Sequence, residues 1–261
     1  MTILDDIVAH KKQTVEQLYK QSSIAYFKED IEKNDFKYYC FESAIKKQGL
    51  SLIAEVKKAS PSKGVIRADF QPLSLAKQFY DNGASALSVL TDVKYFQGAN
   101  AYLSDIKKQV PLATLRKDFI IDEIQVYESK AIGADAILLI LSILTPEQAQ
   151  HLLTVAKSLG LAALIEVHSE DDIQLLMQLS GCQLIGVNNR NLNTFEVNLN
   201  NAPRFKQRIN EAFPDALFIA ESGYSKIDEL EDLKRQEING VLIGEGLALN
   251  EACIRYFKHE S

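Results

Sequence analysis

The sequence has few cysteines and no long apolar segment, and both features narrow the classes of protein it can belong to. Its three cysteines, Cys40, Cys182 and Cys253, are odd in number and far apart, which argues against a disulfide framework or a zinc site and for a reducing compartment. The longest apolar run, Ala136–Leu141, is far too short to cross a bilayer, and the first ten residues do not resemble a signal peptide. We therefore expect a cytoplasmic protein that binds no membrane.

Several other signals are missing. Lysine and arginine number 29 against 35 acidic residues, so the net charge is −6 and we expect no nucleic-acid partner, since such proteins usually carry a basic face. There is no H-E-x-x-H motif and no pair of histidines at metal-ligand spacing, so no metal is expected. The G-x-S-x-G motif of serine hydrolases is also absent.

Eight short, nearly continuous apolar runs follow one another from residue 51 onward. Strands that are covered on both faces, as in the parallel sheets of α/β proteins, show this pattern. The runs are residues 51–56, 84–90, 111–115, 135–140, 161–167, 183–187, 216–220 and 240–243.

Helix signals lie between these runs. Thr145, with a proline after it and Gln148 three residues on, predicts a capped helix start, and Asp122, Ser169 and Ser225 begin similar patterns. Strict alternation of strand and helix predicts parallel strands with right-handed crossovers, and eight units can close into a single (β/α)8 TIM barrel. An open doubly wound sheet is the alternative, weakened because no G-x-G-x-x-G follows the first strand.

Residues 1–48 are highly charged and have little β character. Apolar residues at helical spacing predict an amphipathic helix, then a looser segment through Tyr38–Tyr39, then a short helix near Phe41–Lys47. We interpret residues 1–48 as an N-terminal helical extension and residues 49–261 as the barrel, one domain overall. The extension is expected to cover the bottom or side of the barrel, or to mediate contacts.

Polar residues follow the apolar runs where a barrel has its active site, at the carboxyl ends of the strands. Glu55 and Lys57 are two residues apart and so share one face of the first strand, while Lys117, Glu166 and Glu221 follow later strands. Charges that are buried there must be paired or functional, and mixed carboxylate and ammonium groups suit general acid–base catalysis.

Small residues form turns after the last two runs, at Ser222–Gly223 and Gly244–Gly246, which is the usual phosphate site of this fold. The segment Ser60–Gly64, which contains Lys63, is a candidate substrate clamp. His168 lies just before the Ser169 cap, and a loop or capping role is favoured for it. The residues thus predict acid–base chemistry on a small phosphorylated substrate.

At these positions the sequence closely resembles the indole-3-glycerol phosphate synthases of tryptophan biosynthesis. The resemblance extends over essentially the whole chain, including the N-terminal extension, and its first stretch is long and specific. The matching stretches are IAEVKKASPSKG (53–64), LRKDF (115–119), GADAILLI (133–140), GVNNR (186–190), ESG (221–223) and LIGE (242–245).

The resemblance implies a carboxy-lyase that needs no cofactor and converts 1-(2-carboxyphenylamino)-1-deoxyribulose 5-phosphate to indole-3-glycerol phosphate, carbon dioxide and water. It implies that Lys117 is the general acid and Glu166 the acid–base carboxylate. Lys57 would bind the substrate carboxylate or act as an acid in the dehydration, and Glu55 would keep Lys57 or Lys117 charged. Which of Lys117, Lys57 and Glu166 moves each proton is left open.

The same resemblance implies roles for the remaining site residues. Asn188, Glu221 and Ser222 would orient the substrate. A further group of residues would bind the phosphate, with Arg190 lying behind the residues that contact it. This group consists of Ser60, Arg190, Gly223, Gly244 and Glu245. Two alternatives stay open, another phosphate-binding barrel enzyme such as an isomerase, and a non-catalytic scaffolding member. The expected state is a monomer or weak dimer, with other tryptophan-pathway enzymes as possible partners.

Overall fold

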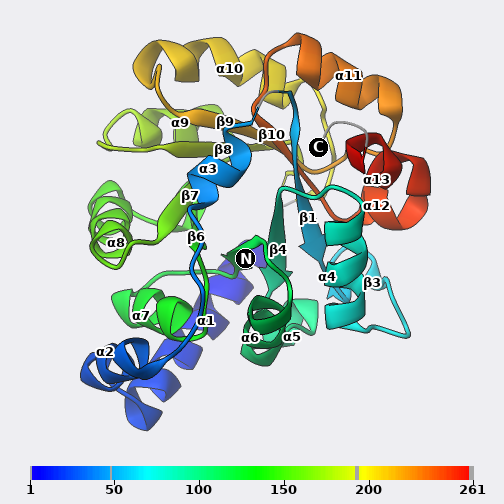
Figure 1. Ribbon diagram of the computed structural model, residues 1–261. Coiled ribbons are helices and arrows are strands. Elements are labelled where there is room, and N and C mark those ends of the chain that lie inside the picture. Colours follow the sequence, from blue (N-terminus) through cyan, green and yellow to red (C-terminus); the bar gives the residue numbers. More distant parts are fainter. Residues whose placement is uncertain (1, 48, 192–193, 259–261) are drawn as a thin grey trace.

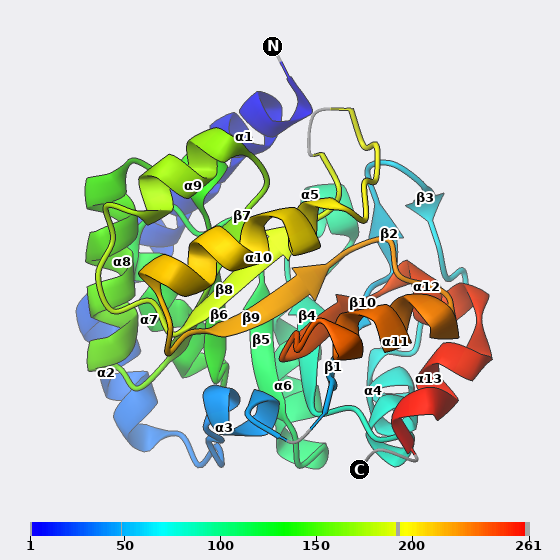
Figure 2. The same cartoon turned by 90° about the horizontal axis from the view of Figure 1, so that it is seen from above.

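The computed structural model describes residues 2–47, 49–191 and 194–258. Eight parallel strands form a closed barrel in the order β1-β10-β9-β8-β7-β6-β5-β4, with helices around it (Figures 1 and 2). The predicted TIM barrel is therefore confirmed, and the open sheet is excluded. The strands are β1 (Ser51–Val56), β4 (Ala86–Leu90), β5 (Ala113–Lys117), β6 (Ala136–Ile140), β7 (Ala162–Val167), β8 (Leu184–Asn188), β9 (Leu217–Glu221) and β10 (Gly240–Ile243).

Each predicted apolar run overlaps one barrel strand, and β1 and β10 match their runs to the residue. Strand β5, the third of the barrel strands along the chain, ends at Lys117 rather than at Leu115. Asn188 and Glu221 are likewise the last residues of β8 and β9. The geometry of the strands therefore sets the directions in which these side chains point. Beyond β1, two short strands form a hairpin that the sequence did not predict, β2 (Ala59–Ser60) and β3 (Gly64–Val65).

The outer helices begin largely where the capping signals predicted. Asp122, Thr145 and Ser169 each form a capping box. The predicted start at Ser225 is wrong by one residue, because Lys226 is the N-cap and Glu229 accepts the Ser225 N–H at 2.8 Å. The elements are α4 (Pro72–Asp81), α5 (Val93–Phe96), α6 (Asn100–Gln109), α7 (Glu123–Ala131), η1 (Leu141–Ile143), α8 (Pro146–Ser158), α9 (Glu170–Leu176), α10 (Asn201–Ala212), α11 (Ile227–Arg235), α12 (Glu245–Leu249) and α13 (Glu251–Lys258).

The N-terminal extension holds three helices, α1 (Ile3–Gln21), α2 (Ile24–Lys33) and α3 (Phe41–Ile45). The expectation of a looser segment after α1 is wrong for α2. Ser23 caps this helix, and its Phe27 joins a buried cluster with Val15 and with Ile124 of α7. Packing on the barrel's outer helix stabilises a segment whose own sequence gives only a weak helix signal.

The extension reaches both ends of the barrel. Phe41 of α3 is buried with Ile53 and Leu115 in the barrel's inner core, and so covers its floor. Helix α1 runs along the side, next to α7 (Figures 1 and 2). The expectation that the extension covers the bottom or side is incomplete, because Ile3 and Ile7 of α1 also line the cavity at the barrel mouth.

Alternation along the strands builds an apolar layer inside the barrel and a charged layer above it. Leu115, Leu164 and Ile219 belong to the inner core. Residues two positions further along each strand point to the same face. These residues are Lys117, Glu166 and Glu221.

A buried ion cluster ties α1 to the barrel mouth. The Lys11 side chain is 5% exposed, and its Nζ lies 2.9 Å from Asp92 Oδ2 and 2.7 Å from Asp118 Oδ1. Asp92 follows β4 and Asp118 follows β5, next to Lys117. Asp118 also pairs with Arg116 at 3.4 Å. One lysine thus fixes a helix of the extension to two strand ends.

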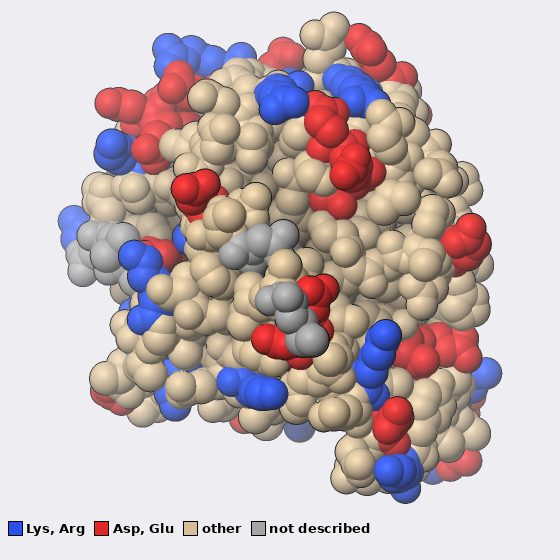
Figure 3. Space-filling model, turned by 180° about the vertical axis from the view of Figure 1, so that it is seen from behind, with Lys and Arg blue, Asp and Glu red and all other residues tan. Residues whose placement is uncertain are grey.

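The outer surface carries charges of both signs. On the face seen in Figure 3, lysine and arginine side chains lie interspersed with aspartate and glutamate. Within the described ranges, none of the helices combines the length and apolar character needed to cross a membrane.

Lys11→Ala should lower the free energy of unfolding by about 3 kcal/mol, because it leaves two buried carboxylates short of a counter-charge. Denaturant unfolding followed by circular dichroism measures this. Lys12→Ala, at an exposed position on the same helix, is the matched control and should leave the curve unchanged. Equal stability of the two variants would show that the buried ion cluster around Lys11 contributes nothing to the free energy of unfolding.

Candidate active site

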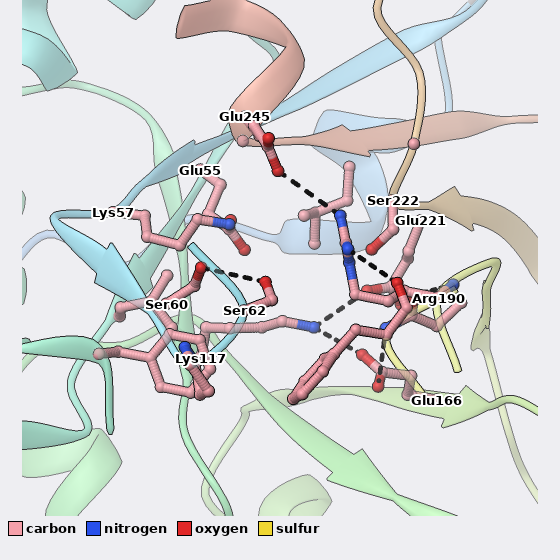
Figure 4. A pocket seen from close by; sticks show the side chains of 18 of the residues that line it. Glu55, Lys57, Ser60, Ser62, Lys117, Glu166, Arg190, Glu221, Ser222 and Glu245 are labelled. Carbon is pink, nitrogen blue, oxygen red and sulfur yellow. Dashed lines mark hydrogen bonds and ion pairs between the residues drawn. The ribbon is translucent and has the colours of Figure 1, made fainter. Parts of the chain in front are cut away.

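One cavity of about 380 Å³ opens at the carboxyl ends of the barrel strands (Figure 4). Every site residue predicted from the sequence lines it: Glu55, Lys57, Ser60, Lys117, Glu166, Asn188, Arg190, Glu221, Ser222, Gly223, Gly244 and Glu245. Apolar side chains form another part of its wall: Ile3, Leu4, Ile7, Phe96, Phe119, Leu138, Ile140 and Leu242. The cavity therefore suits a ligand with both an apolar and an anionic part.

Lys117 stands at the centre of the charged layer. Its Nζ lies 2.5 Å from Glu166 Oε2 and 3.0 Å from Glu221 Oε2, and Figure 4 shows the ammonium pointing at both. The Lys117 side chain is 14% exposed and each glutamate side chain 1%. Three separate strands, β5, β7 and β9, deliver these groups, so only the closed barrel brings them together.

The surroundings give the carboxyl groups of Glu166 and Glu221 different pKa values. Burial raises the pKa of Glu166, but Lys117 and His168 outweigh it and hold that pKa well below its usual value. Burial and then repulsion by Glu166 raise the pKa of Glu221 to about 8, against the attraction of Lys117. Burial lowers the pKa of Lys117, yet the neighbouring carboxylates outweigh it and the net pKa is raised. At neutral pH the site thus holds an ammonium, a carboxylate and a carboxyl that retains a proton.

Glu221 also has an oxygen that is free to bind a ligand. Its Oε1 is buried, and no hydrogen bond to it is found among the residues described. That oxygen lies against Gly186, where any side chain would overlap it. Asn188 Nδ2 donates to Glu166 Oε1 at 3.3 Å and so orients the neighbouring carboxylate. A buried polar atom without a partner is costly, which marks this point as one that a substrate group can satisfy.

Glu55 forms an ion pair with Lys57. Of the two partners that the sequence left open, Lys57 is therefore the one in contact, although Glu55 also contributes to the raised pKa of Lys117. The Lys57 side chain is 17% exposed, so its ammonium remains open to the cavity.

The turns after β9 and β10 face the other side of the cavity. Ser222 and Gly223 have φ values of 67° and 93°, and a side chain at Gly223 would overlap Val197 and Leu199. Gly244 precedes the first turn of α12, whose N–H groups have no partner within a helix. In the described part of the chain, no backbone carbonyl accepts the N–H of Gly223 or Gly244. These N–H groups are available to an anion.

Two cations meet at Glu245 beside these turns. Its Oε2 lies 3.6 Å from an Arg190 nitrogen, and its Oε1 lies 3.5 Å from Lys63 Nζ. Ser60 Oγ and Ser62 Oγ, 3.4 Å apart, come from the hairpin segment (Figure 4). The carboxylate of Glu245 thus holds both cations near the glycine turns, a contact that the sequence did not predict.

His168 contacts a site residue in a way that the sequence reasoning missed. As expected for a capping segment, its N–H donates to Asp172 Oδ2 at 2.8 Å. Its imidazole, however, is buried and its Nε2 lies 2.9 Å from Glu166 Oε1. The signal was present in the sequence, because residues 166 and 168 are two apart and share one face of an extended chain.

The closed barrel and the charged layer at its mouth define a TIM-barrel enzyme. The family model for indole-3-glycerol phosphate synthase matches residues 4–257. An indole-3-glycerol phosphate synthase from Endomicrobium trichonymphae is 43% identical over 246 residues, covering 94% of both chains. One from Acetivibrio thermocellus is 44% identical over 245 residues, covering 93% of both. The chain belongs to the indole-3-glycerol phosphate synthase family, carboxy-lyases of tryptophan biosynthesis.

A solved structure supports the fold alone. It is a crystal structure of KGPDC from Streptococcus mutans, with a TM-score of 0.62 and 13% identity. The match covers 81% of this chain and 96% of that one.

Proposed function

We propose that the chain closes the indole ring of indole-3-glycerol phosphate from 1-(2-carboxyphenylamino)-1-deoxyribulose 5-phosphate, with release of carbon dioxide and water. The observation that carries the proposal is Lys117, part-buried between Glu166 and Glu221 in a cavity with one apolar and one anion-binding side. The apolar wall suits the aromatic ring, the glycine turns suit the phosphate, and Lys57 suits the carboxylate.

Ring closure needs an acid at the ketone oxygen. The ring carbon that bears the carboxylate attacks the ketone carbon, and Lys117 delivers a proton to the oxygen as its negative charge develops. The raised pKa of Lys117 keeps the ammonium charged until then. The alkoxide that would otherwise form is more basic than an amine, so the transfer is favourable in spite of that raised pKa.

Two further bonds must break. Loss of carbon dioxide returns its bonding electrons to the ring system, and the new hydroxyl then leaves as water while a proton is removed. We assign the base to Glu166, which is held anionic, and the acid for the leaving hydroxyl to Lys57, which forms an ion pair with Glu55. Asn188, Glu221 and Ser222 orient the substrate.

The phosphate binds at the turns after β9 and β10. Backbone N–H groups of Gly223, Gly244 and Glu245 approach it, with Ser60 nearby and Arg190 behind. The available N–H groups and the two cations beside Glu245 support this assignment.

We further propose that residues 1–48 and 49–261 form one domain, and that the chain works in the cytoplasm as a monomer or weak dimer beside other enzymes of the tryptophan pathway. The Lys11 cluster supports the single domain. Three free thiols, one of them exposed at Cys40, suit a reducing compartment. Sedimentation velocity tests the oligomeric state.

Lys117→Ala should reduce turnover at least about 100-fold with folding retained, the scale of lost general acid catalysis. Indole fluorescence of the product measures this with little background, since the chain contains no tryptophan. Lys33→Ala removes an exposed ion pair with Glu29 and is the control expected to keep full turnover. Near-normal turnover in Lys117→Ala would refute Lys117 as the acid. Substrate binding without turnover by the folded wild-type chain would favour the scaffolding alternative.

Glu221→Ala should lose mainly substrate orientation, so that kcat/KM falls; a wild-type value would mean that Glu221 is only structural. The substitution Glu221→Gln replaces this carboxyl group with an amide that stays neutral at every pH. Because the pKa of Glu221 is raised to about 8, the wild-type enzyme loses this proton as the pH rises through that value. The wild-type profile of kcat/KM against pH should therefore begin to fall near pH 8, and the Glu221→Gln profile should stay level there.

A further inference from the structure

The two oxygens of Glu166 have different cationic neighbours. Lys117 Nζ lies 2.5 Å from Oε2, while His168 Nε2 lies 2.9 Å from Oε1. Asn188 Nδ2 also donates to Oε1, at 3.3 Å. Lys117 faces the cavity and lines it, whereas His168 is not among the lining residues. Oε1 of Glu166 is thus paired with His168, which lies outside the cavity lining, and Oε2 with the proposed acid Lys117.

The other ring nitrogen of His168, Nδ1, also has close polar neighbours. His168 Nδ1 lies 3.7 Å from Asp172 Oδ2 and 3.4 Å from Ser142 Oγ. The Ser142 hydroxyl contacts both Asp172 oxygens, at 3.0 and 2.8 Å. Asp172 is also the capping-box partner of Ser169 at the start of α9. A fixed helix start therefore holds the carboxylate that faces His168.

Capping alone does not account for this imidazole. The cap uses the backbone N–H of His168 and the side chains of Ser169 and Asp172, and these contacts would accept other side chains at position 168. The imidazole is instead buried between two carboxylates, with its side chain 8% exposed. Burying a charged imidazole costs free energy unless the neighbouring carboxylates pair with it.

We infer that His168 is a positioning residue for Glu166: as an imidazolium backed by Asp172, it fixes one carboxylate oxygen and keeps Glu166 anionic while the other oxygen serves the reaction. The inference rests on the proposed role of Glu166 as the base. In this role His168 is a cationic partner that Glu166 keeps throughout the reaction. When Lys117 gives its proton to the substrate, Glu166 loses one counter-charge, and His168 remains as the cation that stabilises it.

The electrostatics agree with this geometry. Glu166 is faced by Lys117 from β5, Glu221 from β9, Asn188 from β8 and His168 from its own segment. Burial lowers the pKa of His168, but Glu166 and then Asp172 outweigh it and raise that pKa to about 9. The stabilisation from this pair is therefore complete below the ordinary histidine pKa and is lost as the pH rises through about 9.

His168→Gln tests the inference in turnover, with His151→Gln as the matched control, since His151 is an exposed histidine 3.0 Å from Glu123. His168→Gln should lower kcat about tenfold with KM within about twofold, and should move the acid limb of the kcat profile up by about one pH unit, because Glu166 loses an opposite charge. His151→Gln should change neither. A His168→Gln profile that coincides with that of the wild type would overturn the inference.

A second measurement does not depend on turnover or on the folding of His168→Gln. Nitrogen NMR of the four histidines should show one imidazole that is doubly protonated at neutral pH and titrates near pH 9. Glu166→Gln should lower the pKa of that imidazole by at least about one unit; no change would overturn the pairing. If the wild-type chain fails to turn over the substrate, the proposed function fails, and this titration still decides the His168 pairing.

Discussion

The charged layer at the mouth of the barrel depends on one largely enclosed ammonium. Lys117 lies between two glutamates that are almost wholly enclosed, and without its charge Glu166 would keep only His168 as a close cation among the described residues. Such a cluster exists only where the low polarity around it is offset by close pairing. The barrel supplies that closeness, because β5, β7 and β9 bring three residues from distant parts of the chain to one level above an apolar layer. The group that stabilises the mouth of the barrel is thus the one proposed to deliver the proton.

The two glutamates differ although they share a lysine. Glu166 has further partners, His168 and Asn188, and stays ionised. Burial and then repulsion by Glu166 raise the pKa of Glu221 to about 8, so it retains a proton at neutral pH. This division gives the site a base and a neutral carboxyl within reach of one acid. It follows from unequal surroundings of two identical side chains, not from any difference in residue type.

The N-terminal extension belongs to the site as well as to the fold. Ile3 and Ile7 provide apolar wall at the cavity, and Lys11 pairs with Asp118 directly beside Lys117. On the opposite side, Glu245 gathers Arg190 and Lys63 around the glycine turns. The cavity is therefore bounded by an element that precedes the barrel and by the last turn that closes it.

The sequence by itself determined the strands, most helix starts and the residues that gather at the cavity. Continuous apolar runs and capping residues are local signals, and the carboxyl ends of parallel strands meet in any closed barrel. Tertiary structure decided what local signals do not contain. Helix α2 forms because Phe27 packs on α7, Glu55 takes Lys57 as its partner, and His168 turns from a capping segment towards Glu166. Each of these depends on burial between segments far apart in the chain, where the absence of water makes pairing and packing decisive.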